Sequence, residues 1–448
     1  MICRFIRQGV LLLCGIGLWA QADAAQDSIR MNLDQVLATA LTESPAVRIA
    51  DRDVEVKRSY EKEQWAALLP SVAASGTYNR TLKKQVMAMS MNGQTTRIAV
   101  GTDNSWSGGV SLSLPLVAPA LWKTAQMSAQ DVELAMESAR SSRIGLIAQV
   151  KKAYYAVLLA QDSYKVLEQS YRNAQLNAEY VDGRFRQGLA SEFEKLRADV
   201  QVKNALPNLL SAESAVQLAS MQLKVLMGLD VNEPVIFEGS LADYETDMLN
   251  SAASLTASDL SLESNASLRQ LALQTEQLES AIRVLKAAYL PTLSLSASYM
   301  YTALNDNFKF GDYQWNPYSV LALSLNIPIY SGSTKLHKIK QQRLTLQNLA
   351  DTRSDLERSL QLGLDNSLTD IRNAVETLAS NKETVAMAEK AYSISRKQYE
   401  VGMNTLLELN DAELALTQSR LAETQSVYAY MSACADLEQL LGTTARNE

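Results

Sequence analysis

The sequence is short of the residues that compact β folds and most enzymes need. Only nine of its 448 residues are proline, aromatic residues make up 6%, and there is one histidine. We find no nucleophile elbow, no glycine-rich phosphate loop and no cluster of metal ligands in it. The net charge of −7 argues against nucleic acid as a partner. We therefore expect no enzyme and no cofactor, and long helices rather than a compact all-β fold.

Long apolar runs are also missing after the first 24 residues, so no transmembrane helix is expected there. At the N-terminus, two arginines precede a short apolar run from Val10 to Ala20, and Ala22-Asp23-Ala24 is a small-x-small cleavage site. Residues 1–24 are therefore predicted to be a secretory signal peptide. Its removal leaves Cys434 as the only cysteine, which excludes an internal disulfide.

The remaining sequence contains an internal repeat. Four landmarks recur in the same order at a nearly constant separation, which is the signature of a duplicated unit. The pairs are Pro70 and Pro291, Pro115 and Pro328, Gly188 and Gly402, and Gly228 and Gly442. We predict a first repeat over residues 25–228, a linker or equatorial region over 229–255, a second repeat over 256–442 and a tail over 443–448.

Each repeat is predicted to contain a helix, two strands joined by a polar loop, a long helix and a return helix. The strands are expected at about residues 70–80, 106–117, 291–303 and 318–330, and the four prolines mark the strand–helix junctions, because proline cannot donate to a sheet. The long helices are expected at about 120–186 and 334–401, and the return helices at about 191–227 and 405–441. A helix of about 67 residues is about 100 Å long.

The helices alone leave a long soluble coiled coil open as an interpretation. The return helix of the second repeat is amphipathic, as such a structure requires. Its apolar residues are Leu406, Leu409, Ala412, Leu416 and Leu421, and its polar residues include Glu408, Asp411, Glu413, Gln418 and Arg420. Small residues are frequent in these helices, which suits side-by-side packing in sheets or tubes.

The strands favour a membrane protein instead. From Thr292 to Tyr299, hydroxyl side chains alternate with apolar or aromatic ones, so the strand has one apolar face and one hydroxyl face. About ten residues of this kind cross a bilayer when tilted. Four strands cannot close a membrane barrel, for which about eight is the minimum, so we expect an oligomer. Two copies would supply eight strands and three would supply twelve, and twelve leave room for a channel.

The twofold repeat, the strands LPSVAASGTY and LPTLSLSASY, and the turn YEVGMNTLLELNDAEL resemble the TolC-type outer-membrane efflux family over nearly all of the mature chain. The resemblance implies a fold that is mainly α with a membrane β-barrel. Three protomers would form a twelve-stranded β-barrel in the outer membrane, continued by a twelve-helix α-barrel in the periplasm. It implies a homotrimeric exit duct for small molecules in contact with outer-membrane lipid.

The partners implied by the resemblance are a periplasmic adaptor protein and an inner-membrane pump of the RND or ABC type. Two alternatives stay open at this point. One is the outlet of a type I protein-secretion system, which would have the same fold. The other is a periplasmic coiled-coil scaffold without a pore. A simple porin is disfavoured by the extent of the helices.

The resemblance also identifies residues at the helical tip. The implied adaptor-docking turns contain Gly188, Leu189, Ala190 and Ser191 in the first repeat, and Val401, Gly402, Met403 and Thr405 in the second. The resemblance also implies an acidic constriction formed by Glu408 and Asp411, six and nine residues after Gly402. They are three residues apart and share a helix face, so threefold symmetry would bring six carboxylates together. The ordinary alternatives are a plain helical turn and a solvated acidic face.

The implied latch of the closed gate is altered in this sequence. Tyr399 matches the tyrosine of the family latch and Glu194 matches its acidic partner, whereas Asn404 stands where the family has a basic residue. The salt link should therefore be absent, or Lys195 or Arg197 should replace it.

One further pattern concerns metal binding. Met87, Met89 and Met91 alternate in QVMAMSMNG, within the first strand-connecting loop. Thioethers are soft ligands that suit Cu(I) or Ag(I). The interpretation that we favour is an apolar stripe on a strand extension, so the sequence predicts no metal site.

Overall fold

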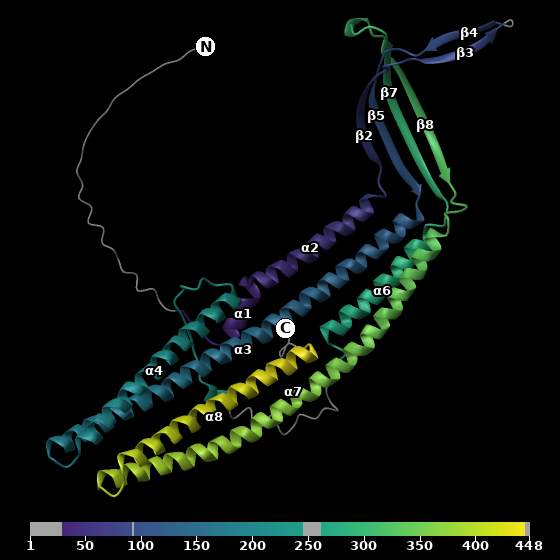
Figure 1. The fold of residues 1–448 in the computed structure, drawn as a ribbon. Helices are drawn as coiled ribbons and strands as arrows, with labels where there is room; N and C mark the ends of the chain where they lie inside the picture. The colour runs from purple at the N-terminus through teal and green to yellow at the C-terminus, as the bar shows by residue number, and fades with distance from the viewer. Residues whose placement is uncertain (1–28, 92–93, 245–260, 444–448) are drawn as a thin grey trace, which may run out of the picture.

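The computed structural model describes residues 29–91, 94–244 and 261–443 (Figure 1). The predicted signal peptide, the second part of the linker and most of the predicted tail lie outside the described residues. The protomer is elongated, with a sheet at one end and two helical turns at the other (Figure 1).

A four-stranded antiparallel sheet forms the first of these ends, in the strand order β2-β5-β7-β8. The strands are β2 (Ser71–Arg80), β5 (Asn104–Val117), β7 (Thr292–Asn305) and β8 (Asn316–Asn326). Leu112 lies opposite both Val72 and Ala297, and Leu295 lies opposite Leu323. Because directly paired side chains share a face, most apolar positions of the four strands form one face and most serines form the other. The first residues of β8 depart from this pattern, since Ser319 pairs with Tyr299 and Val320 pairs with Ser298.

The sheet is open at both edges. All of β2 is exposed, and all but one residue of β8. Such edges present rows of unpaired backbone N–H and C=O groups, which a bilayer does not tolerate. The sheet of one protomer is therefore an incomplete unit in a membrane.

One predicted strand end is wrong. The fourth strand ends at Asn326 and not near Tyr330, so Pro328 lies beyond it, where the missing N–H costs no ladder hydrogen bond. Pro115 does lie inside β5, and the pairing register with β7 shifts between Pro115 and Val117. Pro70 and Pro291 immediately precede β2 and β7.

The predicted polar loop of the first repeat contains a second sheet. Strands β3 (Gln85–Met91) and β4 (Gln94–Val100) form an antiparallel hairpin that projects from the end of the main sheet (Figure 1). Lys84 fixes the base of this hairpin through ion pairs with Asp103 at 3.3 Å and Asp306 at 2.7 Å. The alternation of Met87 and Met89 with smaller residues is therefore a strand pattern, as the apolar-stripe interpretation requires.

Two long helices run from the sheet to the tip and determine the length of the protomer (Figure 1). They are α3 (Pro119–Arg186, 68 residues) and α7 (Thr334–Glu400, 67 residues). The shorter helices are α1 (Leu33–Glu43), α2 (Pro45–Ala66), α4 (Glu192–Met227), α6 (Ala266–Ala287) and α8 (Leu406–Leu441). Among the described residues, no helix is both long enough and apolar enough to cross a membrane.

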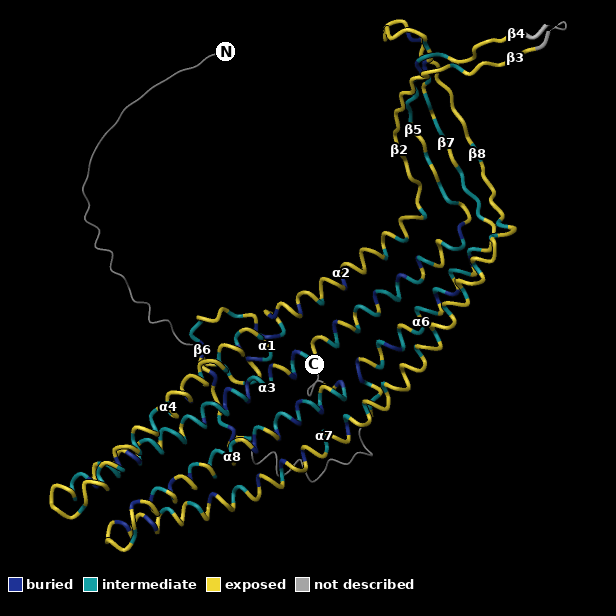
Figure 2. Tube along the Cα trace, viewed as in Figure 1, coloured by how far each residue is buried: buried dark blue, intermediate teal, exposed yellow. Residues whose placement is uncertain are grey.

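The helices form a single curved layer. Toward the sheet α3 packs against α2 and α6, and toward the tip it packs against α4 and α8, while α7 packs against α6 and α8. The order across the layer is thus α2-α3-α6-α7 in one half and α4-α3-α8-α7 in the other (Figure 1). The outer helices leave long exposed faces (Figure 2).

The short helices meet end to end at equivalent points of the two repeats. Gly228 closes α4 with φ 80°, and a Cβ there would lie 2.5 Å from the carbonyl oxygen of Glu43, just before α2. Gly442 closes α8 with φ 68°, and a Cβ there would lie 2.3 Å from the carbonyl oxygen of Ser264, just before α6. Both positions need glycine for the left-handed conformation and for the close approach.

The largest apolar core lies at this middle level (Figure 2). It gathers fully buried side chains such as Val150, Leu158 and Leu223 from α3 and α4, together with residues of α7 and α8. The linker contributes β6 (Val235–Phe237), which pairs in parallel with β1 (Ile29–Met31) and covers the core. The linker thus contains a short strand.

Candidate functional site: the helical tip

The two helical hairpins end in turns of the same construction. Gly188 and Gly402 adopt left-handed conformations, with φ of 73° and 79°. In each turn the next residue donates its N–H to a carbonyl five residues earlier, Leu189 to Arg184 and Met403 to Gln398, both at 2.8 Å. These bonds are those of a helix C-cap with glycine, which satisfies the last carbonyls of α3 and α7.

A capping box then begins each return helix. Ser191 accepts from the N–H of Glu194 at 3.2 Å, and Glu194 accepts from the N–H of Ser191 at 3.0 Å. In the second turn, Glu408 accepts from the N–H and the hydroxyl of Thr405, both at 2.8 Å. Glu194 and Glu408 are therefore equivalent residues of the two repeats. The pattern Ser/Thr-x-x-Glu was visible in the sequence, and it predicts this role.

The acidic residues predicted at the constriction lie on the exposed side of α8. Hydrogen bonds from the backbone and side chain of Thr405 lower the pKa of Glu408, so its carboxylate is ionised at neutral pH. Asp411 is exposed one turn further along the helix. The two side chains are thus free to face a neighbouring copy.

Tyr399 joins the two hairpins at the tip. Its side chain is 3% exposed, and its ring centroid lies 6.0 Å from that of Tyr180 on α3. The guanidinium of Arg184 lies over the Tyr399 ring at 5.6 Å, and its Nη1 donates to the Tyr399 carbonyl at 3.4 Å. Burial and the nearby Glu194 carboxylate raise the pKa of Tyr399. Glu194 thus lies close enough to Tyr399 to affect the charge of its phenol.

A small apolar cluster supports this contact. It consists of Val181, Ala198, Tyr399, Leu406 and Leu409, all buried. These residues come from all four helices at the tip, so the cluster fixes the second hairpin against the first. Ala190 of the first turn packs against it.

Arg184 is the cation that lies over the Tyr399 ring, and no pattern in the sequence pointed to it. Lys195, one of the two proposed substitutes, pairs instead with Asp182 at 2.6 Å, within its own hairpin. Asn404 donates to the Ser395 hydroxyl at 2.8 Å, also within its own hairpin. Because Arg184 and Tyr399 are distant in the sequence, no local pattern could have paired them.

The docking turns are exposed and partly apolar. Leu189, Val401 and Met403 are among the exposed large hydrophobic residues, and Met403 reaches 79%. A cleft of about 520 Å³ lies between the turns. Tyr180 and Arg184 line it on one side, and Val401 and Gly402 line it on the other.

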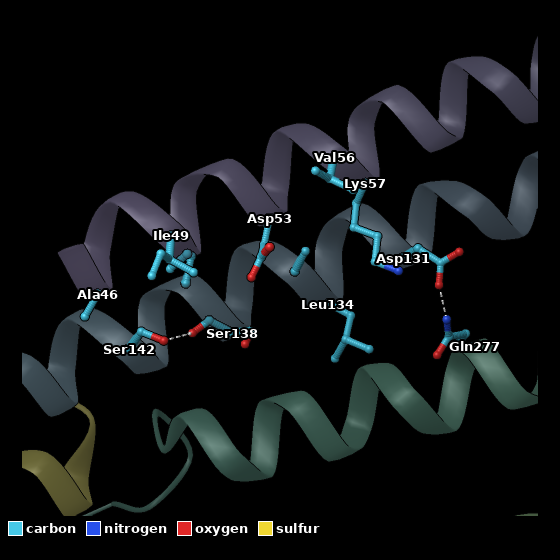
Figure 3. Close-up of a pocket in the computed structure, with 13 residues that line it drawn as sticks. Ala46, Ile49, Asp53, Val56, Lys57, Asp131, Leu134, Ser138, Ser142 and Gln277 are labelled. Atoms are coloured by element: carbon cyan, nitrogen blue, oxygen red, sulfur yellow. Dashed lines mark hydrogen bonds between the residues drawn. The ribbon is translucent and has the colours of Figure 1, made fainter.

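A second groove lies in the half near the sheet, on α3 between α2 and α6 (Figure 3). Its volume is about 580 Å³, and alanine and serine contribute much of its lining. Asp53 and Lys57 approach it from α2, and Gln277 of α6 donates to Asp131 of α3 at one end (Figure 3). No pattern in the sequence pointed to this groove.

The methionine pattern lies far from the tip. Met87 and Met89 are exposed in β3. In the described part of the chain, no group of three or more His, Cys, Asp or Glu residues could hold a metal ion.

A two-faced, open sheet on paired helical hairpins of this length defines a protein that builds a membrane duct with other copies of itself. The family model of outer membrane efflux proteins matches residues 36–229 and 257–443, and the chain belongs to this family. The two matched segments correspond to the two repeats. The protein is therefore an outer-membrane exit duct that extends into the periplasm, as predicted from the sequence.

The relatives agree with this assignment. Outer membrane protein TolC of Escherichia coli is 23% identical over 450 residues, which cover 96% of this chain and 86% of the relative. TolC of Vibrio cholerae is 21% identical over 389 residues, which cover 86% of this chain and 84% of the relative.

Solved structures share the fold. The Neisseria gonorrhoeae MtrE outer membrane channel, in its open state, has a TM-score of 0.71 at 17% identity, covering 92% of this chain and 88% of its own. The Campylobacter jejuni CmeC outer membrane channel has a TM-score of 0.70 at 15% identity, covering 92% and 85%. The predicted fold class, helices continued by a membrane sheet, is confirmed.

Proposed function

We propose that three copies of the chain form a passive duct through which a tripartite efflux system expels small molecules. A periplasmic adaptor and an inner-membrane pump of the RND or ABC type supply substrate and energy. The observation that carries this proposal is the open four-stranded sheet, because its register gathers most apolar side chains on one face and most hydroxyl side chains on the other.

The edges of the protomer support closure into a ring. The sheet is open at β2 and β8, and the helical layer is open at α2 and α4 on one side and at α7 on the other. In a ring, β8 of one copy pairs with β2 of the next, and α7 packs against the neighbour's α2 and α4. Three copies give twelve strands, which is wide enough for an aqueous channel, whereas the eight strands of a dimer would be filled by side chains.

The helical tip is the proposed gate. The contact of Tyr399 with Arg184 and Tyr180 holds the two hairpins of each protomer together. Glu408 and Asp411 remain exposed, and threefold symmetry would gather their carboxylates around the axis. Such a ring attracts cations and repels anions. The closed tip is then a narrow, cation-selective constriction.

The turns are the proposed docking surface for the adaptor. Their exposed side chains Leu189 and Val401 line the cleft between the hairpins, and Met403 is exposed on the second turn. An adaptor that inserts there would touch both hairpins of a protomer at once. It could thereby favour their separation, because it gains contacts that the closed tip does not offer.

Planar-bilayer recording of the purified mature protein tests this function, with its mass in detergent determined alongside. We expect a trimer with small, cation-selective conductance steps. A protein that stays monomeric and soluble without detergent, and that gives no conductance, would contradict the duct and favour a scaffold.

A further inference from the structure

Glu413 is a buried carboxyl group in the contact between the two hairpins. The sequence places it among the polar residues of an amphipathic helix, yet only 3% of it is exposed. It lies on α8, two turns beyond the capping box of Thr405. Its burial is a correction to the sequence pattern, because α3 covers the side of α8 that carries it.

The carboxyl group is poorly satisfied. Oε2 accepts from Asn177 Nδ2 over 3.5 Å, a long hydrogen bond. Oε1 is shut off from solvent and has no hydrogen-bond partner among the described residues. A buried carboxylate that lacks both a cation and strong donors is unfavourable, so the neutral form is the stable one in this arrangement.

The groups that face Glu413 are neutral on each neighbouring helix. On α3 they are the amides of Asn173 and Asn177, and on α7 it is the phenol of Tyr392. Arg396, one turn beyond Tyr392, pairs with Glu400 at 3.3 Å. On α8 itself, Thr417 donates to the backbone carbonyl of Glu413 and not to its carboxyl group.

We propose that Glu413 is a proton-operated contact of the gate: its protonated form holds α8 against α3, and its ionised form drives the two hairpins apart at the tip. This inference rests on the proposed gate. It implies that the opening of the duct depends on periplasmic pH as well as on the docking of its partner proteins.

The direction of the response follows from the burial. Burial raises the pKa of Glu413 from 4.5 to about 7 while α8 is packed against α3. When the hairpins separate, water reaches the carboxyl group and the ordinary pKa returns. Below pH 4.5 both arrangements are protonated, so the packed one is not penalised. Between the two pKa values, each rise of one pH unit shifts the equilibrium between packed and separated hairpins about tenfold toward separation, per protomer. Above the raised pKa, a further rise in pH does not change this equilibrium.

The first test is single-channel recording from about pH 5 to about pH 8. The variants are Glu413→Gln and a matched control, Glu383→Gln, which changes an exposed glutamate on α7. We expect the open probability of the wild type and of the control to rise with pH. Glu413→Gln should stay at the low-pH level of the wild type throughout. A wild-type pH response that Glu413→Gln retains would overturn the inference.

The second test does not depend on conductance. Infrared difference spectra of the trimer between the same pH limits should show a protonated carboxyl band that titrates near neutrality, and this band should be missing in Glu413→Gln. Its absence from the wild type would overturn the inference even if the channel responds to pH. If the protein gives no conductance in planar bilayers but the infrared band is present, the proposed duct is contradicted and the proton-binding site is still supported.

Discussion

Replacing Tyr399 by alanine should open the tip. The side chain is 3% exposed and contacts Tyr180 and Arg184 across the hairpin interface. An aromatic pair contributes about 0.5–1.5 kcal/mol beyond its buried area, and a cation–π contact contributes about 0.5–1 kcal/mol. The change therefore removes about 1–2.5 kcal/mol of hairpin contact from each protomer, in addition to the loss of buried area.

This loss corresponds to a shift of about tenfold per protomer toward the separated hairpins. If the three contacts break together, their effects multiply, and a closed constriction becomes a frequently open one. The assay is the open probability of single channels in planar bilayers. The trimer mass should be measured for each variant, because a misassembled protein also changes conductance.

Two control variants isolate the contact. Tyr399→Phe keeps the ring, so it should behave as the wild type. Arg184→Lys keeps the charge but loses the planar guanidinium, and it should give an intermediate opening. If Tyr399→Ala assembles as a trimer and its open probability equals that of Tyr399→Phe, the contact with α3 does not hold the gate closed.

Four further predictions concern the caps and the acidic ring. Gly228→Ala should reduce the free energy of unfolding by about 1–3 kcal/mol and so lower the thermal midpoint of the helices. The left-handed φ and the Glu43 carbonyl oxygen, 2.5 Å from the position of a Cβ, leave no room for the added methyl group. Gly183→Ala, which meets open space inside α3, should not lower it; equal losses would refute the argument. Thr405→Ala should speed hydrogen exchange in the first turn of α8, at a cost of about 1 kcal/mol. In the wild type, hydrogen exchange in the same turn should become faster only in acid. The Thr405 hydrogen bonds lower the pKa of Glu408, so their stabilisation is fully present above the ordinary pKa of 4.5 and is lost as the pH falls through the lowered pKa. Glu408→Gln combined with Asp411→Asn should reduce the preference for cations in reversal-potential measurements, and unchanged selectivity would rule out the ring.

The features that the sequence predicts are those encoded locally. Alternation over a few residues is enough to identify β7, and the scarcity of proline and glycine is enough to identify α3 and α7. The glycines Gly188 and Gly402 mark the turns because a left-handed helix end excludes most side chains. Each of these signals depends on the backbone conformation of the residues that carry it.

The features that the sequence does not predict depend on contacts between distant segments. Arg184 and Tyr399 meet only because α8 packs against α3. Glu413 follows the spacing of a polar residue on an amphipathic helix, and only the arrival of α3 makes its position buried. The hairpin β3–β4 is a different case, since the alternation of its methionines favoured a strand extension, whereas the segment around them was predicted to be a polar loop.

The internal repeat identifies the equivalent of Glu413 in the first repeat, which is Asp199. Asp199 lies eleven residues after Gly188, as Glu413 lies eleven after Gly402, but Asp199 is exposed on α4, at the open edge of the layer. In the ring proposed here, α7 of the neighbour covers α4 as α3 covers α8.

Asp199 should therefore be covered by the next copy. In a Cys434→Ser background, Asp199→Cys should react slowly with a bulky thiol reagent in the trimer. Gln418→Cys, at an exposed position of α8, which is flanked by α3 and α7 of its own protomer, should react rapidly. Equal rates would mean that the contact between protomers does not repeat the contact within a protomer. The twofold repeat would then hold within each protomer but would not extend to the contacts between protomers. The gate would contain three buried carboxyl groups, those of Glu413, instead of six, those of Glu413 and Asp199.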